Sequence, residues 1–122
     1  MAIKKILVVD DSPTEALFLS EILGKNGFKV TVAADSDQAM GKLEAEAFDL
    51  ILMDVVMPGQ NGYQATRAIK KDDRFKDIPV IMCTTKGLET DRVWGMRQGA
   101  SDYIVKPVKA EELLDKIAKL TQ

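Results

Sequence analysis

The sequence predicts a doubly wound α/β domain, in which five helices cover both faces of a five-stranded parallel sheet. Five short apolar runs alternate with longer amphipathic segments along the 122 residues, and this alternation is typical of parallel sheets with crossover helices. The runs 6–9 and 50–53 are apolar without interruption, which favours strands that are buried on both faces. No linker or repeat interrupts the pattern, so we expect residues 1–122 to form one domain.

The first strand, 6–9, leads into a helix with a clear start signal. Ser12 is the expected N-cap, and Glu15, three residues later, is expected to close a capping box with it. The helix ends near Gly24 and Gly27, either of which can take the left-handed conformation that ends a helix.

The second strand is expected over 28–32, where apolar residues alternate. Asp35 or Ser36 can cap the helix that follows, and its apolar face is expected to reach Ala47. The third strand, 50–53, ends directly at Asp54, and the turn-forming segment "PGQNG" comes shortly after it.

The second half of the chain continues the alternation. The expected elements are, in chain order, a helix at about 63–71, a strand at 79–84, a helix at about 89–98 that Gly99 ends, a strand at 103–105 and a helix at about 110–120. In the helix before Gly99, we expect Val93, Met96 and Ala100 to face the core. That phase places Trp94 on the flank, either buried or half-exposed toward a partner.

Composition excludes several classes of protein. Lys and Arg (17) nearly balance Asp and Glu (19), and the net charge of −2 gives no nucleic-acid footprint. The single cysteine, Cys83, excludes an intramolecular disulfide and agrees with a reducing compartment. The apolar run 6–9 is too short for a signal peptide or a membrane span. We therefore expect a cytoplasmic protein with no nucleic-acid or membrane partner, in which Cys83 is an inert core residue.

Asp54 is the first candidate functional residue, because an isolated ionised carboxylate at the edge of a core is costly. Ligands of open parallel sheets bind at the carboxyl ends of the strands. We expect the flavodoxin-like strand order 2-1-3-4-5, in which strands 1, 3, 4 and 5 are neighbours. The residues that would converge there are Asp10 and Asp11 after the first strand, Asp54 after the third, Thr84 or Thr85 at the fourth and Lys106 after the fifth.

Three carboxylates in one cleft repel each other, by roughly 4 kcal/mol per pair at about 4 Å and an effective dielectric constant near 20. Oxygen ligands without His or clustered Cys indicate a hard divalent cation, Mg²⁺ before Mn²⁺. Lys106 is suited to hold a phosphoryl oxygen, and Thr84 can donate a hydrogen bond to another. Asp54 stands alone at its strand end and is the expected nucleophile for a phosphoryl group. The pair Asp10 and Asp11 are the expected metal ligands.

The sequence resembles the receiver domains of two-component response regulators, the CheY-like family, over essentially its whole length. The resemblance rests on four separated stretches in the right order: "VVDDS" at 8–12, "LMDVVMPGQNG" at 52–62, "TT" at 84–85 and "GASDYIVKP" at 99–107. The stretches most similar to the small stand-alone receivers of type IV pilus (twitching motility) chemotaxis systems are "DSPTE", "VMPGQNGYQATR" and "TTKGLETDRVWGMRQGA".

The resemblance implies a role for each residue of the cleft. Asp10 and Asp11 would bind Mg²⁺, and Asp54 would be phosphorylated by a histidine kinase or its phosphotransfer domain. The backbone carbonyl of Val56 would be a further metal ligand. Thr84 would be the switch hydroxyl.

The same resemblance implies that Lys106 senses the phosphate and that the Lys106–Pro107 bond is cis, which an X–Pro bond tolerates. Tyr103 would be the switch aromatic. The face formed by the fourth helix, the fifth strand and the fifth helix would then change its affinity for an unknown downstream protein. The candidate contact residues on that face are Lys86, Trp94, Tyr103 and Lys109.

Three alternatives compete with this interpretation. We expect no output domain after Gln122, so the domain would signal by binding, or would serve as a phosphate sink for a kinase shared with another receiver. An aspartyl-phosphate phosphatase would want a second acid two residues beyond the nucleophile, where Val56 stands. A flavodoxin-like electron carrier would need a Ser/Thr/Gly-rich phosphate loop, whereas "DDSPTE" is acidic. We expect no enzyme activity beyond the domain's own phosphoryl transfer and dephosphorylation.

Overall fold

The computed structural model describes residues 3–55, 61–85 and 89–120. Within them, strands and helices alternate along the chain. The strands are β1 Lys5–Val9, β2 Lys29–Ala33, β3 Leu50–Asp54, β4 Val80–Thr84 and β5 Asp102–Val105. The helices are α1 Pro13–Lys25, α2 Ser36–Ala45, α3 Gly62–Lys71, α4 Glu89–Arg97 and α5 Ala110–Leu120.

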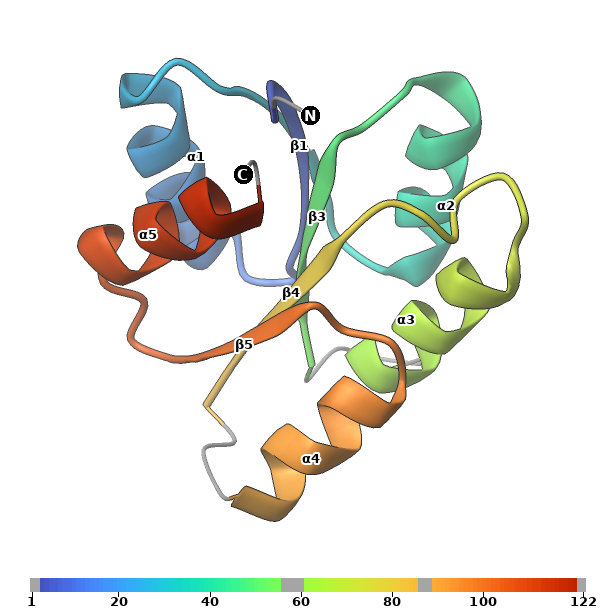
Figure 1. The fold of residues 1–122 in the computed structure, drawn as a ribbon. Helices are drawn as coiled ribbons and strands as arrows, with labels where there is room; N and C mark the ends of the chain where they lie inside the picture. The colour runs from blue at the N-terminus through green and yellow to red at the C-terminus, as the bar shows by residue number, and fades with distance from the viewer. Residues whose placement is uncertain (1–2, 56–60, 86–88, 121–122) are drawn as a thin grey trace.

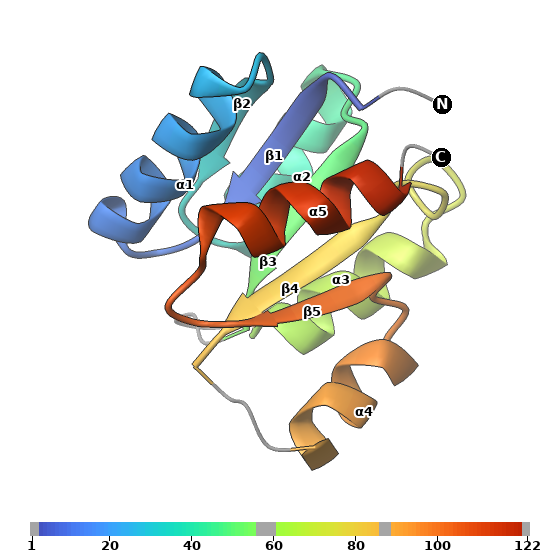
Figure 2. The same cartoon turned by 60° about the vertical axis from the view of Figure 1, so that its left-hand side comes forward.

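The five strands form one parallel sheet in the order β2-β1-β3-β4-β5. Helices α1 and α5 lie on one face of this sheet, and α2, α3 and α4 lie on the other (Figure 1). Figure 2 shows α5 in front of the strands, α3 behind them and α4 below β5. The predicted strand order and the two helical layers are confirmed.

The core has one main layer on each face of the sheet. Ile6 and Val8 point into the layer under α1 and α5, whereas Leu7 and Val9 point into the layer under α2 and α3. This alternation is that of a strand, and all four side chains are fully buried. A third, smaller cluster lies under α4 and consists of Val55, Tyr63, Met82, Ala100 and Tyr103.

The register of the strands brings their carboxyl ends to one edge of the sheet. Asp54 pairs with Cys83, and Thr84 pairs with Val105. Asp10 directly follows β1, and its backbone N–H still donates to the end of β2. The residues that end or follow these strands therefore share the edge at which ligands of parallel sheets bind.

The start of α1 differs from its prediction in one bond. Ser12 is the N-cap, as predicted, and its Oγ accepts the Glu15 N–H at 3.3 Å. The predicted capping box is wrong, because the Ser12 N–H donates to the Asp10 carboxylate at 2.9 Å. A complete capping box stands instead at the start of α3, where Asn61 and Gln64 bond reciprocally.

At two other helix ends, the sequence left two candidate residues open, and the structure shows which of them ends or caps the helix. Gly27 takes the left-handed conformation after α1, with a φ of +88°. Asp35 caps α2, since its carboxylate accepts a backbone N–H of the first turn at 2.8 Å. The prediction that the apolar face of α2 reaches Ala47 is wrong, because the backbone becomes extended at Glu46 and Ala47 is exposed.

Helix α4 faces the core with a different side from the predicted one. Val93 and Met96 are 42% and 45% exposed, so their assignment to the core is wrong. The buried residue of α4 is Gly95. A Cβ there would lie 2.9 Å from the Met82 sulfur and 3.1 Å from the Tyr103 ring. The helix therefore packs through a position that has no side chain, which a hydrophobic pattern does not reveal.

We predict that the Cys83 thiol does not react in the folded protein. Burial raises the pKa of this thiol to about 12, so it stays protonated at neutral pH. The side chain is 1% exposed, so a reagent cannot reach the sulfur. Iodoacetamide labelling followed by intact mass should show no adduct at neutral pH without denaturant. The labelling rate should rise together with global unfolding in urea, and rapid labelling of the native protein would contradict the burial of this strand.

Candidate functional site

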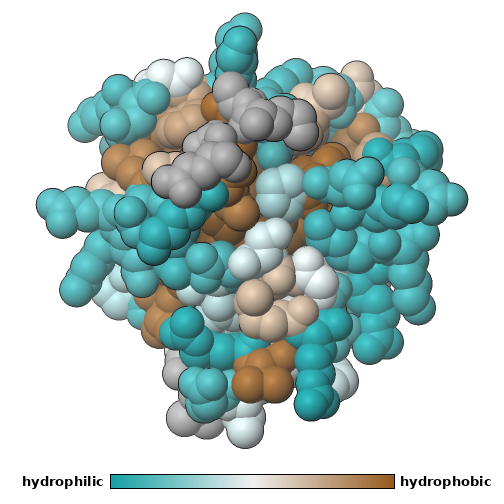
Figure 3. Space-filling model, viewed as in Figure 1, coloured by the Kyte–Doolittle hydropathy of each residue, from teal (hydrophilic) through white to brown (hydrophobic). Residues whose placement is uncertain are grey.

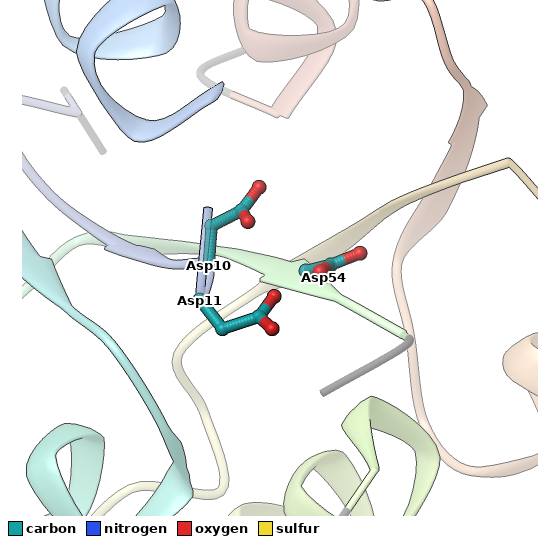
Figure 4. Close-up of side chains that lie close together, drawn as sticks. All are labelled: Asp10, Asp11 and Asp54. Carbon is teal, nitrogen blue, oxygen red and sulfur yellow. The ribbon is translucent and has the colours of Figure 1, made fainter. Parts of the chain in front are cut away.

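Three carboxylates meet at the carboxyl edge of the sheet. Asp10 and Asp11 follow β1, Asp54 ends β3, and ligand oxygens of the three lie within 4.8 Å of one another. The carboxylates point to the same side of the strands (Figure 4). Asp10 and Asp54 are buried, with 3% and 6% exposure, and Asp11 is exposed. The strand order thus brings together the acids that the sequence places at strand ends.

In the part of the chain that the structure describes, Lys106 is the cation that faces this cluster. Its Nζ lies 3.1 Å from Asp10 Oδ2 and 3.5 Å from Asp54 Oδ1, and its side chain is 11% exposed. Burial by itself lowers the pKa of Lys106, but the hydrogen bond to Asp10 and the charges of both carboxylates outweigh burial and raise the pKa overall. Lys106 therefore stays charged and offsets part of the repulsion between the two buried acids.

The cluster is short of positive charge. Within the described ranges, no cation forms an ion pair with Asp11. Among the described residues, three carboxylates face one ammonium, and a divalent cation would offset the excess of acidic groups. The donors are all oxygens, which suits Mg²⁺. Asp10, Asp11 and Asp54 thus fit such an ion, whereas Val56, the fourth predicted ligand, lies outside the described residues.

Thr84 and Lys106 are joined at the ends of β4 and β5. Thr84 is fully buried, and its carbonyl accepts the Lys106 N–H at 2.7 Å. Its neighbour Thr85 is exposed, so Thr84 is the threonine of the pair that belongs to the interior. The Lys106–Pro107 bond is cis, as the resemblance implies.

Gly62 is a residue of the site that sequence reasoning missed. Its N–H donates to the Val55 carbonyl at 2.8 Å, and a Cβ on it would overlap the carbonyl oxygen of Asp54. Only a glycine lets the start of α3 approach the main chain of Asp54 so closely. The signal that could have found it is the Asn61–Gly62 pair in the turn-forming loop.

Tyr103 lies beneath α4 and is 2% exposed. Burial and the neighbouring hydroxyl of Tyr63 raise its pKa, and the Arg92 guanidinium lies 5.8 Å from the ring centroid. The prediction that Tyr103 is a contact on an exposed partner face is wrong for this conformation, because its ring fills the space beside Gly95.

The other predicted partner contacts are Trp94, Lys109 and Lys86. Trp94 is 49% exposed, which confirms that it is not buried. Lys109 is also exposed, and a partner contact at either residue stays a prediction. Lys86 lies outside the described residues.

Fold and site together define a class of protein: a doubly wound parallel domain with an acidic, lysine-bearing pocket at its strand ends. Residues 6–118 match the family described as "Response regulator receiver domain", and the chain belongs to that family. Receiver domains are signalling proteins rather than typical enzymes. They interact with histidine kinases or phosphotransfer proteins and bind Mg²⁺ at an acidic pocket.

The chain is similar to several curated relatives. It is 51% identical to Protein PilH of Pseudomonas aeruginosa over 113 residues, which cover 93% of each chain. It is 40% identical over 114 residues to the phosphate regulon transcriptional regulatory protein PhoB of Escherichia coli K12. Those residues are 93% of this chain and 50% of PhoB, so this relative is about twice as long.

The chain is also similar to solved structures of chemotaxis and receiver-domain proteins. The chemotaxis protein CheY4 of Vibrio cholerae superposes with a TM-score of 0.90 at 33% identity, over 97% of this chain and 98% of that one. A BeF3-activated DrrB receiver domain superposes with a TM-score of 0.86 at 29% identity, over all of both chains. In the described part of the chain, every helix is too short or too polar to span a membrane.

We predict that Lys106→Met lowers the free energy of unfolding by about 3 kcal/mol in the absence of divalent cations. The substitution leaves the buried Asp10 and Asp54 carboxylates without their counter-charge, and breaking a buried pair is costly. Urea unfolding followed by circular dichroism measures the change. The matched control is Lys119→Met, which breaks the exposed pair with Asp115 and should cost less than about 1 kcal/mol. Equal losses in the two variants would show that Lys106 does not offset the acidic cluster.

Proposed function

We propose that this protein is a response regulator that accepts a phosphoryl group on Asp54 and signals by phosphorylation-dependent protein binding. The donor is a histidine kinase or its phosphotransfer domain, and the reaction depends on Mg²⁺, with Mn²⁺ able to replace it. One observation supports the proposal above all others: the buried Asp54 carboxylate lies among two further acids, with Lys106 at 3.5 Å.

The choice of Asp54 as acceptor follows from the contacts of its neighbours. The Asp10 carboxylate accepts the Ser12 N–H and pairs with Lys106 at 3.1 Å, so it is held in a fixed position. Asp11 is exposed at the mouth of the cluster. Both are suited to ligate a metal, whereas Asp54 ends the central strand β3.

The transfer itself needs little from the protein beyond placement and charge. A carboxylate oxygen of Asp54 forms a bond to phosphorus while the phosphorus–nitrogen bond of the donor's phosphohistidine breaks, and the imidazole leaves with the electron pair. Asp10, Asp11, Asp54 and the carbonyl of Val56 would hold Mg²⁺, which neutralises charge on the phosphoryl oxygens. The Lys106 ammonium binds one of those oxygens. The chain's own chemistry is then limited to phosphoryl transfer onto and off Asp54.

Thr84 and Tyr103 connect the phosphoryl group to α4. Tyr103 pairs with Met82, two residues before Thr84 on β4, so Thr84 and Tyr103 are diagonal neighbours on one face of the sheet. A hydrogen bond from the Thr84 hydroxyl to a phosphoryl oxygen draws that side chain toward Asp54. The movement leaves room beside Tyr103 and stabilises the buried position of its ring. Phosphorylation thus shifts the population of two states through differential contacts.

The output surface includes α4. Val93, Trp94 and Met96 are exposed on this short helix, and a small apolar area flanked by hydrophilic side chains stands at the foot of the molecule, where α4 lies (Figure 3). An exposed apolar patch of this kind, rimmed by polar residues, is typical of a partner surface. Lys109, which is exposed just before α5, is a further candidate contact.

The similarity to PilH supports a role in a pilus-motility pathway of the chemotaxis type. The identity of 51% extends over 93% of both chains, and the three stretches that resemble pilus receivers include Asp11, Gly62 and Thr84. A kinase-coupled role of this kind belongs to the cytoplasm, where the single buried cysteine, Cys83, stays reduced.

We predict that acetyl phosphate adds one phosphoryl group to this protein, on Asp54, and only in the presence of Mg²⁺ or Mn²⁺. Intact mass shows the addition, and peptide mapping after borohydride reduction locates it. Asp54→Asn should abolish the addition. The control Asp49→Asn changes a carboxylate at the opposite end of β3 and should be phosphorylated like the wild type. Phosphorylation of Asp54→Asn at the wild-type rate would refute the assignment.

A second prediction concerns the switch. Beryllofluoride with Mg²⁺ replaces the phosphoryl group, and it should change the fluorescence of Trp94 and the amide resonances of α4 and β5 more than those of α1 and α2. Thr84→Ala should bind beryllofluoride but show a smaller change in fluorescence and resonances than the wild type. The control Thr85→Ala, at the exposed neighbouring position, should show the same change as the wild type. A perturbation that stays within the metal site of the wild type would favour the phosphate-sink alternative.

A further inference from the structure

A groove of about 500 Å³ lies between α3 and the C-terminal part of α4 with Gln98. Trp94 forms part of its wall from α4. Asn61, Gln64, Arg67 and Lys71 line it along α3. These four positions extend over the whole length of α3, about 15 Å at 1.5 Å per residue.

A buried amide ties the two walls of the groove together. Gln98, which is 7% exposed, accepts a hydrogen bond from the Arg67 Nε at 2.8 Å. Its own Nε2 donates to the Trp94 carbonyl at 3.4 Å. Arg67 is therefore fixed relative to Trp94 before any ligand arrives, which reduces the entropy lost on binding. Both bonds satisfy the buried amide of Gln98, as is usual for buried polar side chains.

The groove presents hydrogen-bond donors and positive charge. The side-chain oxygens of Asn61 and Gln64 are occupied by the capping box, so their amide N–H groups are what they can offer to a ligand. Within the part of the chain that the structure describes, no carboxylate lines the groove, and neither Arg67 nor Lys71 pairs with one. Arg74, by contrast, pairs with acids on two sides.

We propose that this groove binds an acidic peptide segment of a partner protein. Carboxylates of the segment pair with Arg67 and Lys71, its backbone carbonyls accept from Asn61 and Gln64, and an apolar side chain packs on the Trp94 indole. The donors are spread along α3, and the backbone N–H groups of the helix flank are already bonded within the helix. A phosphate site concentrates its donors, backbone N–H groups included, on one point. The spread of donors therefore suits a chain of carboxylates better than a nucleotide.

The groove is connected to the site of Asp54. The Tyr63 hydroxyl donates to the Asp91 carbonyl at 3.3 Å and links α3 to α4. Tyr63 also belongs to the cluster that contains Tyr103, whose ring supports Gly95. The groove has its present form with Tyr103 buried. If phosphorylation stabilises that position, as the proposed function has it, phosphorylation also tightens peptide binding, and this second part of the proposal rests on the proposed function.

The test is a titration of the full chain with two blocked peptides, Glu-Glu-Phe-Glu-Glu and its neutral counterpart Gln-Gln-Phe-Gln-Gln. Nuclear magnetic resonance follows the Arg67 Nε–H and the indole N–H of Trp94, the single tryptophan of the chain. The acidic peptide should shift both resonances at millimolar concentration, and the neutral one should not. Two results would overturn the proposal: acidic peptide that moves neither resonance, and AMP or inorganic phosphate that saturates them at lower concentration than the peptide.

Variants separate the groove from general electrostatics. Lys71→Ala and Arg67→Ala should each weaken binding of the acidic peptide by up to about tenfold, the loss expected for one charge-assisted contact. Arg67→Ala leaves Gln98 without its partner and can destabilise the fold. Lys71→Ala removes no buried contact, so its effect on peptide affinity tests the proposal even if Arg67→Ala is unstable. The matched control is Lys42→Ala, an exposed lysine in the last turn of α2. Equal weakening by the control would mean that the peptide binds by net charge alone and would overturn the assignment.

The same titration with Mg²⁺ and beryllofluoride tests the connection to Asp54. Fluorine resonances report whether beryllofluoride is bound, and the acidic peptide should then bind at least about fivefold more tightly. Bound beryllofluoride with unchanged peptide affinity would refute the connection between the groove and Asp54. The proposal that the groove binds an acidic peptide would then be decided by the first titration alone. Absence of bound beryllofluoride would instead refute the proposed function, whatever the peptide does.

Discussion

The structure depends on the mutual repulsion of three carboxylates held at the edge of an apolar core. Asp10 and Asp54 follow strands whose side chains are almost completely buried, and two buried acids at close range cost several kcal/mol unless a cation intervenes. Lys106 supplies that cation from β5, but it offsets only part of the charge. Among the described residues the acids at this edge of the sheet thus outnumber the cations, and an all-oxygen cluster of this kind suits a divalent ion.

The same lysine couples the charge cluster to the backbone of the sheet. Its side chain reaches Asp10 and Asp54, while its N–H bonds to the Thr84 carbonyl at 2.7 Å. A change of charge at Asp54 therefore acts on the ends of β4 and β5 at once. Those ends hold Thr84 and, two positions before Val105, Tyr103.

The fold and the acidic cluster could be predicted from the sequence because both follow from strong, local patterns. Uninterrupted apolar runs such as 6–9 specify strands covered on both faces, and parallel order then fixes where the residues after them meet. The orientation of α4 could not be predicted, because its buried position is Gly95, which has no side chain to enter a hydrophobic pattern. The bond from Arg67 to Gln98 joins residues that are 31 positions apart, and neither residue is distinctive alone. Polar pairs of this kind become visible only once two helices are placed side by side.

Helix α4 is the element that the rest of the structure holds least. Of its own residues only Gly95 is buried, whereas α3 buries five of its ten. Little apolar area therefore keeps α4 in place, and its position relies on the Tyr103 ring under Gly95 and on the bond from Tyr63 to the Asp91 carbonyl. Elements with few buried contacts are those that move at low cost in free energy. A weakly anchored helix on a well-packed sheet suits the proposed switch, because the Tyr103 ring under Gly95 belongs to a strand residue that pairs with Met82, two positions before Thr84.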